Sequence, residues 1–222
     1  MPASTPIVVY GAGGHARSVI EAIEAEGRWR IVGLVDEDPG RVGDHVLGYE
    51  VLGTPDLLPA LRSDGVSGGF PALGNNEHRL RAARELCAAE LDLVDVVHPT
   101  ALVMKHAAVG AGSFLYAYSV VGPECRLGHA AIVSAHVTVG HQSHLGDAVH
   151  LEPGARVGGG CRIGDRCTFG TGAVVYARTT IGHDVQVWAN AVVTRDAPDG
   201  AALSGLPARV VARADHGQRE GV

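Results

Sequence analysis

Histidine is the residue type through which this sequence could carry out acid–base chemistry. The chain holds 12 histidines in 222 residues. An imidazole with an ordinary pKa of about 6.5 can take up or release a proton near neutral pH. Six of them fall in the second half of the chain at positions expected to face outward, namely His129, His136, His141, His144, His150 and His183. A single exposed histidine is more often inert than functional, so the surroundings of each must decide.

A glycine-rich stretch near the N-terminus could bind a phosphate. Residues 11–16 read Gly-Ala-Gly-Gly-His-Ala, after an apolar run at 6–10 and before a helical pattern that ends at Gly27. A strand, a tight turn and a helix in this order present backbone N–H groups and a helix N-terminus to an anion. Asp36 ends the next apolar run and could accept a hydrogen bond from a hydroxyl of a ribose or a base. A strand-to-helix turn without a ligand is the alternative.

The remainder of the N-terminal region predicts a small α/β domain. Short helices are expected at 54–61 and from Asn75 to about Ala89, and strands at 65–74 and 91–97. Residues 1–96 therefore read as a half-Rossmann unit. This is too small for a full dinucleotide dehydrogenase with its own substrate domain.

A six-residue repeat organises the rest of the chain. From Val97 to Val193 every sixth residue is aliphatic or Phe, and the residue four places later is small or β-branched. Two such positions, for example Ser143 and Leu145, are two residues apart and face the same side of an extended strand. Glycine often follows the aliphatic residue and predicts a bend. The pattern indicates a parallel β-helix over residues 97–211, with about eighteen residues per coil and a polar tail at 212–222.

The eighteen-residue step predicts which side chains stack. It puts His141 in one column with Pro123 below it and with Gly159 and Ala177 above it. Two small residues over an imidazole would leave room for a thin ligand. His150 lies nine residues further on, half a coil around the prism. If both histidines serve one site, that site must lie between subunits, most simply in a homotrimer.

Composition narrows the possible partners and the compartment. The net charge is −6 without a basic block, so no nucleic-acid or membrane-surface binding is expected. No apolar stretch of about eighteen residues and no signal sequence is present. Three of the four cysteines, Cys125, Cys161 and Cys167, fall on the inward register and read as core residues. A reduced, cytoplasmic protein without a metal ion fits.

The order of motifs along the chain resembles the bacterial nucleotide-sugar N-acetyltransferases that modify 4-amino-4,6-dideoxy sugars, with sialic-acid O-acetyltransferase-like proteins as near relatives. The motifs are Gly11-x-Gly-Gly-His15, Gly74-Asn75-Asn76, His98-Pro99-Thr100, Gly140-His141, His150 and Gly205-x-Pro-Ala-Arg209. The resemblance implies a left-handed β-helix that holds acetyl-CoA at a trimer interface. It also implies a GDP- or UDP-linked amino sugar as substrate, such as perosamine or a bacillosamine precursor.

The resemblance also implies roles for individual residues. The nucleotide sugar would contact Gly13, Gly14, His15, Asp36 and Gly74. Acetyl-CoA would lie along His150, Gly159, Thr171 and Ala189. His141 would be the general base in a direct transfer without an acyl-enzyme, with Gln142 beside it. Many relatives carry a carboxylate directly after this histidine. Gln142 can orient the ring but cannot stabilise imidazolium by charge, so either another acid does so or the histidine is less basic.

Three other functions stay open at this point. The same scaffold could acetylate a sugar hydroxyl instead of an amine. A zinc β-helix of the carbonic-anhydrase type would use His136 and His141, which are five residues apart, although it needs no nucleotide domain. A structural trimer with a vestigial sugar-binding domain is the non-enzymatic alternative.

Overall fold

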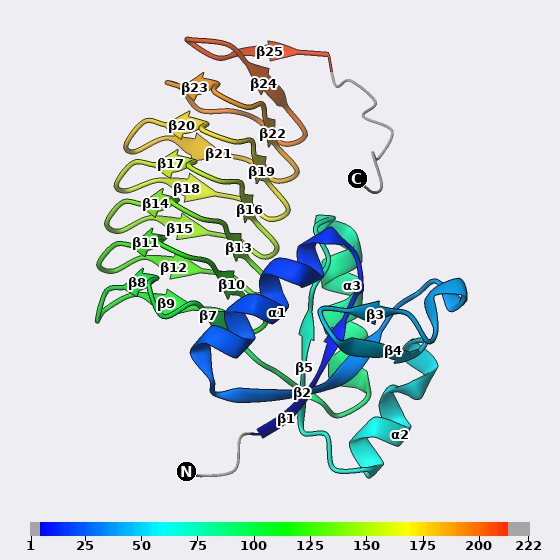
Figure 1. The fold of residues 1–222 in the computed structure, drawn as a ribbon. Coiled ribbons are helices and arrows are strands. Elements are labelled where there is room, and N and C mark those ends of the chain that lie inside the picture. The colour runs from blue at the N-terminus through cyan, green and yellow to red at the C-terminus, as the bar shows by residue number, and fades with distance from the viewer. Residues whose placement is uncertain (1–4, 213–222) are drawn as a thin grey trace. The chain divides into compact units, whose positions relative to one another are not determined.

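The computed structural model describes residues 5–212. The chain divides into two compact units, the first ending at Pro99 and the second beginning at Thr100 (Figure 1). The polar tail was expected at 212–222, and its part beyond Ala212 lies outside the described residues.

The first unit is built on a six-stranded sheet in the order β3-β4-β2-β1-β5-β6. All pairs are parallel except β3 with β4. The chain moves from β1 outward to β4 and returns to the other side of β1 at β5. The carboxyl ends of β1 and β5 therefore form the switch point where open α/β sheets bind ligands. The strands of this sheet are β1 (Thr5–Tyr10), β2 (Trp29–Val35), β3 (His45–Val46), β4 (Tyr49–Gly53), β5 (Gly68–Pro71) and β6 (Asp92–Leu93). The short strand β7 (Val96–Val97) follows and is not part of it.

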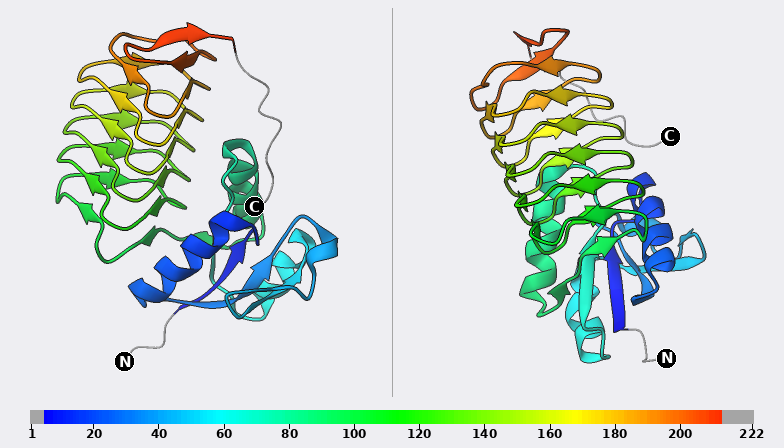
Figure 2. Two further views of the ribbon diagram at one scale, coloured as in Figure 1. Left: turned by 45° about the horizontal axis from the view of Figure 1, so that its top comes forward. Right: turned by 90° about the vertical axis from the view of Figure 1, so that its left-hand side faces the viewer.

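Helices cover both faces of this sheet. In the right-hand view of Figure 2, α1 (Gly14–Glu26) lies on one side and α3 (Asn76–Ala88) on the other. The remaining helices are η1 (Pro39–Arg41), η2 (Pro55–Leu57) and α2 (Leu58–Ser63). α1 ends as expected, because Gly27 adopts a left-handed conformation and its N–H caps the carbonyl of Ile23. α3 begins at Asn75, whose side chain accepts from the N–H groups of Glu77 and His78.

Two details of this unit differ from the prediction. The pair β3–β4 was not anticipated. The strand expected at 91–97 is two strands of two residues each, β6 and β7.

The second unit is the predicted parallel β-helix. From β8 to β20 each strand pairs in parallel with the strand eighteen residues later, as Val120 with Thr138 and Arg126 with His144. Figure 2 shows the resulting coils stacked on one another. One face runs β23-β20-β17-β14-β11-β8, a second β21-β18-β15-β12-β9, and the third from β25 through β24, β22, β19, β16 and β13 to β10. The two-residue strands are β8 (Leu102–Val103), β9 (Ala108–Val109), β10 (Phe114–Leu115), β11 (Val120–Val121), β12 (Arg126–Leu127), β13 (Ile132–Val133), β14 (Thr138–Val139), β15 (His144–Leu145), β16 (His150–Leu151), β17 (Arg156–Val157), β18 (Arg162–Ile163), β19 (Thr168–Phe169), β20 (Val174–Val175), β21 (Thr180–Ile181), β22 (Gln186–Val187) and β23 (Val192–Val193).

Two positions of each six-residue repeat point into the β-helix: the aliphatic one and the small or β-branched one four places later. From Leu115 to Val193 every aliphatic position is buried, and so is every small position from Ser113 to Ala197. The three inward cysteines are buried free thiols, which confirms their reading as core residues. Beyond the repeat, β24 (Ala202–Ser204) pairs antiparallel with β25 (Arg209–Val211).

The bends are made differently from the prediction. The glycine that often follows the aliphatic residue was expected to form the bend, yet the left-handed residue lies two places after that glycine position. Non-glycine residues often occupy it, such as Glu124 (φ 60°) and Gln142 (φ 57°). The glycines serve close stacking instead. A Cβ on Gly140 would stand 2.6 Å from the backbone nitrogen of Gly159 in the next coil.

No helix within residues 5–212 has the length and apolar content needed to cross a membrane.

Candidate functional site

The glycine-rich turn after β1 is open and lacks a side-chain cap. Gly13 is the N-cap of α1 without a side-chain hydrogen bond, and both Gly13 and Gly14 are exposed. The first turn of α1 carries no acidic residue. Its backbone N–H groups can therefore receive an anion, as the sequence predicted.

Asp36 supports this turn from the end of β2. One carboxylate oxygen accepts from the N–H of Ala12 at 2.7 Å, and the other accepts from the N–H of Asp38 at 3.0 Å. Arg41 lies 3.7 Å from the same carboxylate. The observed role of Asp36 is to hold the turn in shape, and its contact with a ligand stays a prediction.

His15, which is half-buried, and the fully buried Arg79 influence each other electrostatically near the turn. Burial, with a smaller contribution from the positive charge of Arg79, lowers the pKa of His15 to about 4, so His15 is neutral at physiological pH. Arg79 donates to the carbonyls of Leu73 and Gly74 at 2.9 and 3.0 Å and to Asn76 at 2.7 Å. Burial lowers the pKa of Arg79 to about 9, which leaves it charged. Arg79 thus holds the loop after β5, which contains the predicted residue Gly74, at the switch point.

The sequence did not single out Arg79. It stands at the first position of the inward stripe of α3, ahead of the buried Ala82, Ala83 and Leu86. A charged residue among otherwise apolar inward positions is the feature of the sequence that could have indicated its buried role.

A hollow of about 810 Å³ opens at the carboxyl ends of β1, β2 and β4. Its polar lining includes Tyr10, Glu37, Thr54, Arg81 and Glu85. The Tyr10 hydroxyl donates to Glu85 at 2.6 Å and to Glu37 at 3.3 Å, while Arg81 donates to both oxygens of Glu37 at 2.6 Å. Burial and the bond to Glu85 raise the pKa of Tyr10, which keeps the phenol protonated. The hollow opens at the carboxyl ends of the strands, which is the edge where open α/β sheets bind ligands, beside the switch point between β1 and β5.

In the β-helix, His141 lies in the turn after β14 and is exposed. A Cβ on Gly159 would stand 2.5 Å from its Nε2, so the imidazole lies directly against Gly159 of the next coil. The N–H of Gly160 donates to the carbonyl of His141 at 2.8 Å. The expected stacking of Gly159 on His141 is confirmed.

The other ring nitrogen of His141 faces a polar pair. Nδ1 lies 3.4 Å from Oε1 of Gln142, and Nε2 of Gln142 donates to Oε2 of Glu124 at 2.9 Å. The sequence pointed to Gln142 but not to Glu124. Glu124 precedes Gln142 by eighteen residues, so the column count could have found it.

Three of the other outward histidines make contacts between coils. Nδ1 of His183 accepts from the N–H of Asp165 at 2.9 Å, and His144 contacts Arg162. The ring of His136 stacks on Tyr118 with 5.3 Å between the centroids. Across residues 5–212 no group of three or more His, Cys, Asp or Glu side chains could hold a metal ion.

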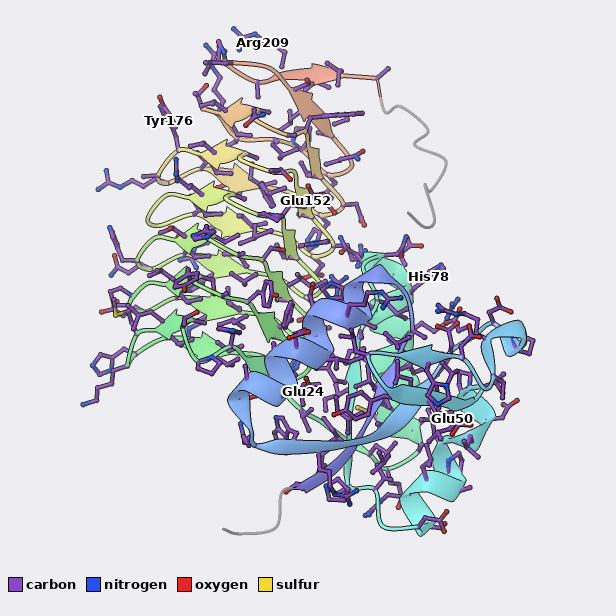
Figure 3. The ribbon with its side chains drawn as sticks, in the orientation of Figure 1. Glu24, Glu50, His78, Glu152, Tyr176 and Arg209 are labelled. Atoms are coloured by element: carbon purple, nitrogen blue, oxygen red, sulfur yellow. The ribbon has the colours of Figure 1, made fainter. Side chains whose placement is uncertain are left out.

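The predicted acetyl-CoA residues fall into separate places on one chain. Gly159 lies at the corner that holds His141. Thr171 and Ala189 lie at another corner, after β19 and β22, where the N–H and hydroxyl of Thr171 donate to Glu152 at 2.9 and 3.1 Å. Glu152 is labelled in Figure 3. His150 begins β16, which lies on the same face as β19 and β22, whereas β14 and β17 lie on another face. Their binding roles stay predictions.

Both units match described families. Residues 6–86 match the PglD N-terminal domain, and residues 142–177 match the bacterial transferase hexapeptide of six repeats. Among curated relatives, the GDP-perosamine N-acetyltransferase of Escherichia coli O157:H7 is 26% identical over 154 residues, which cover 68% of this chain and 69% of the relative. The UDP-N-acetylbacillosamine N-acetyltransferase of Bacillus subtilis (strain 168) is 29% identical over 112 residues, 50% of this chain and 51% of the relative.

Solved structures extend the match to nearly the whole chain. An H141N mutant of perosamine N-acetyltransferase from Caulobacter crescentus, in complex with CoA and GDP-perosamine, is 36% identical with a TM-score of 0.89. The match covers 94% of this chain and 97% of that one. This chain belongs to the nucleotide-sugar N-acetyltransferase family. The acetyltransferase domain of PglB from Neisseria gonorrhoeae FA1090, in complex with acetyl coenzyme A, is also similar, at 35% identity and a TM-score of 0.87. That match covers 94% of this chain and 100% of the other.

Family membership confirms the resemblance that the motifs carried. The α/β unit followed by a hexapeptide β-helix is the architecture of these N-acetyltransferases. In this chain, two groups of residues are candidates for substrate binding and catalysis. The first surrounds the turn after β1, and the second surrounds His141.

Proposed function

We propose that this chain transfers the acetyl group of acetyl-CoA to the 4-amino group of a GDP- or UDP-linked 4-amino-4,6-dideoxy sugar. The observation that carries the proposal is the match over nearly the whole chain to a structure that contains both CoA and GDP-perosamine. The geometry supports it with an open glycine-rich turn in the first unit and an exposed histidine in the second.

The nucleotide part of the substrate has three recognition elements in the first unit. The diphosphate would receive hydrogen bonds from the backbone at Gly13 and Gly14, at the positive end of α1. Arg79 contributes a fixed positive charge behind this turn, and the neutral His15 can hydrogen-bond without adding charge. The base would enter the hollow at the ends of β1, β2 and β4, beside Tyr10 and Glu37.

Transfer needs one proton acceptor and no covalent enzyme intermediate. The neutral amine attacks the thioester carbonyl carbon, and a C–N bond forms. The C–S bond then breaks, and CoA leaves as the thiolate. Nε2 of His141 takes the proton that the amine loses and can pass it to the thiolate. A positioned base of this kind contributes about 10²- to 10⁴-fold to the rate.

The cysteines of the β-helix do not suit an acyl-enzyme. Cys125, Cys161 and Cys167 are buried, and burial raises the pKa of all three thiols, that of Cys167 to about 12. A thiol that stays protonated is a poor nucleophile.

We also propose that the active form is a closed homotrimer in the cytoplasm. His141 follows β14 and His150 begins β16, and these two strands lie on different faces of one prism, so a site that uses both histidines would be completed by a neighbouring copy. Acetyl-CoA as co-substrate supports a cytoplasmic location. A monomer in sedimentation equilibrium at micromolar concentration would refute the trimer.

The test compares GDP- and UDP-linked 4-amino sugars with their 4-hydroxy analogues in a thiol-release assay with acetyl-CoA. We expect thiol release with an amino sugar and little with its hydroxyl analogue. Preferred turnover of the hydroxyl analogue would instead establish O-acetylation.

A further inference from the structure

We propose that Glu124 is a positioning residue that sets the proton of His141 through the side chain of Gln142. This inference deepens the proposed function and rests on it for its kinetic part. Glu124 has no predicted role in binding either substrate. It reaches the reacting histidine only through one intervening amide.

The two ends of the Gln142 side chain are chemically different. Its carbonyl oxygen only accepts hydrogen bonds, and its NH₂ group only donates. The ionised carboxylate of Glu124 only accepts, and it lies 2.9 Å from Nε2 of Gln142. The NH₂ group must therefore face Glu124, and Oε1 must face His141.

This orientation decides which nitrogen of His141 carries the proton. Since Oε1 of Gln142 accepts, Nδ1 of His141 at 3.4 Å must be the protonated nitrogen of the neutral ring. Nε2 then holds the free lone pair. That atom lies against Gly159, which has no side chain, and His141 is exposed. The relay thus presents the basic nitrogen on the outer side of the β-helix.

The backbone holds both relay residues at equivalent positions one coil apart. Glu124 (φ 60°) and Gln142 (φ 57°) both occupy the left-handed corner of their hexads. The N–H of Gln142 donates to the carbonyl of Pro123 at 2.9 Å, which ties the two corners together. The backbone therefore already places the carboxylate at 124 within hydrogen-bond reach of the amide at 142.

The relay also answers the question left by Gln142. The acid that supports His141 is Glu124, one hydrogen bond removed, instead of the residue directly after the histidine. A neutral amide between a carboxylate and an imidazole transmits orientation with little direct charge. We therefore expect the relay to act mainly on the tautomer.

The test compares Glu124→Gln, Gln142→Glu and the double variant in which the two side chains are exchanged. In Glu124→Gln the new side chain at position 124 can accept or donate, so the amide of Gln142 is free to turn over. The population of the Nδ1–H tautomer of His141 should then fall, and kcat should fall about 3- to 10-fold. Gln142→Glu alone places two carboxylates at hydrogen-bond distance, which should also lower kcat. In the double variant, Glu at 142 accepts from both Nδ1–H and Gln at 124, so tautomer and kcat should return to within about twofold of wild type.

Tautomers are read from the ring ¹⁵N shifts of histidine-labelled protein, with the His141 signal assigned from its loss in His141→Asn. Asp184→Asn is the matched control, since Asp184 is a paired carboxylate at the same left-handed position of another hexad. An unchanged tautomer and kcat in Glu124→Gln, or a double variant no better than the singles, would overturn the relay. The tautomer is measured without turnover. If wild-type protein transferred no acetyl group, the proposed function would fail while the relay was still decided.

Discussion

Gly159→Ala is the substitution whose effect the structure defines most sharply. A Cβ at this position would stand 2.5 Å from Nε2 of His141, 2.8 Å from Cε1 and 2.9 Å from Cδ2. All three contacts are shorter than carbon atoms tolerate, so the imidazole must move. The ring is the exposed end of a side chain, so we expect it to turn away while the coil stays intact.

The size of the effect follows from the geometry of proton transfer. A general base acts over about 2.6–3.2 Å, and a displacement of about 1 Å can cost about 10²-fold in rate. We expect kcat to fall about 100-fold, and the free energy of unfolding to change by less than about 1 kcal/mol because no backbone contact is lost.

The assay is steady-state thiol release with an amino-sugar nucleotide, together with thermal unfolding. Gly159 is also a predicted acetyl-CoA contact, so the KM for acetyl-CoA is measured beside kcat. The control is Gly159→Ala in a His141→Asn background, where it should cost little more. A kcat within twofold of wild type, or an equal further loss in that background, would show that the methyl group does not act through the imidazole.

Three further predictions concern residues away from His141. With a thiol reagent, one cysteine per native chain should react, the exposed Cys87, and all four cysteines should react after denaturation. Cys87→Ser should leave no reactive thiol in the native protein. Rapid reaction of a second thiol in the native protein would contradict the burial of the other three cysteines in the β-helix. Arg79→Met should lower the free energy of unfolding by about 3 kcal/mol in urea titrations, because the carbonyls of Leu73 and Gly74 lose a buried charged donor; a loss below about 1 kcal/mol would contradict this. Because the pKa of His15 is lowered to about 4 in the folded protein, His15 is protonated in the unfolded chain at a higher pH than in the folded one. The stability present above about pH 6.5 is therefore lost as the pH falls toward 4. Between pH 7 and 4.5 wild type should lose about 2 to 3 kcal/mol more than His15→Gln, and equal losses would contradict the burial of a neutral imidazole.

The repeat made much of the β-helix predictable. Each hexad fixes the side on which its residues point, and the eighteen-residue count places Gly159 on His141 from the sequence alone. The glycine-rich turn and the helix that ends at Gly27 were equally readable. In these stretches the local rule and the fold agree.

The missed features depend on contacts that no local rule describes. Tyr10 meets Glu85 across 75 residues. Arg79 looks like a surface charge until the loop after β5 folds over it. The left-handed corners carry residues such as Gln142 instead of glycine, because hydrogen bonds between coils hold the strained backbone. Glu124 stood in the predicted column of Gln142, but only the side-chain geometry shows that the two are joined.

The most direct test of the proposed function is mass analysis of the sugar product. Purified protein is incubated with acetyl-CoA and a GDP- or UDP-linked 4-amino-4,6-dideoxy sugar, in parallel with His141→Asn. The function proposed here predicts one acetyl group on the sugar nitrogen and one free CoA per product, formed at least about 100-fold more slowly by His141→Asn. No acetylated sugar with either nucleotide would contradict the proposed activity, and equal rates for the two proteins would contradict His141 as the base.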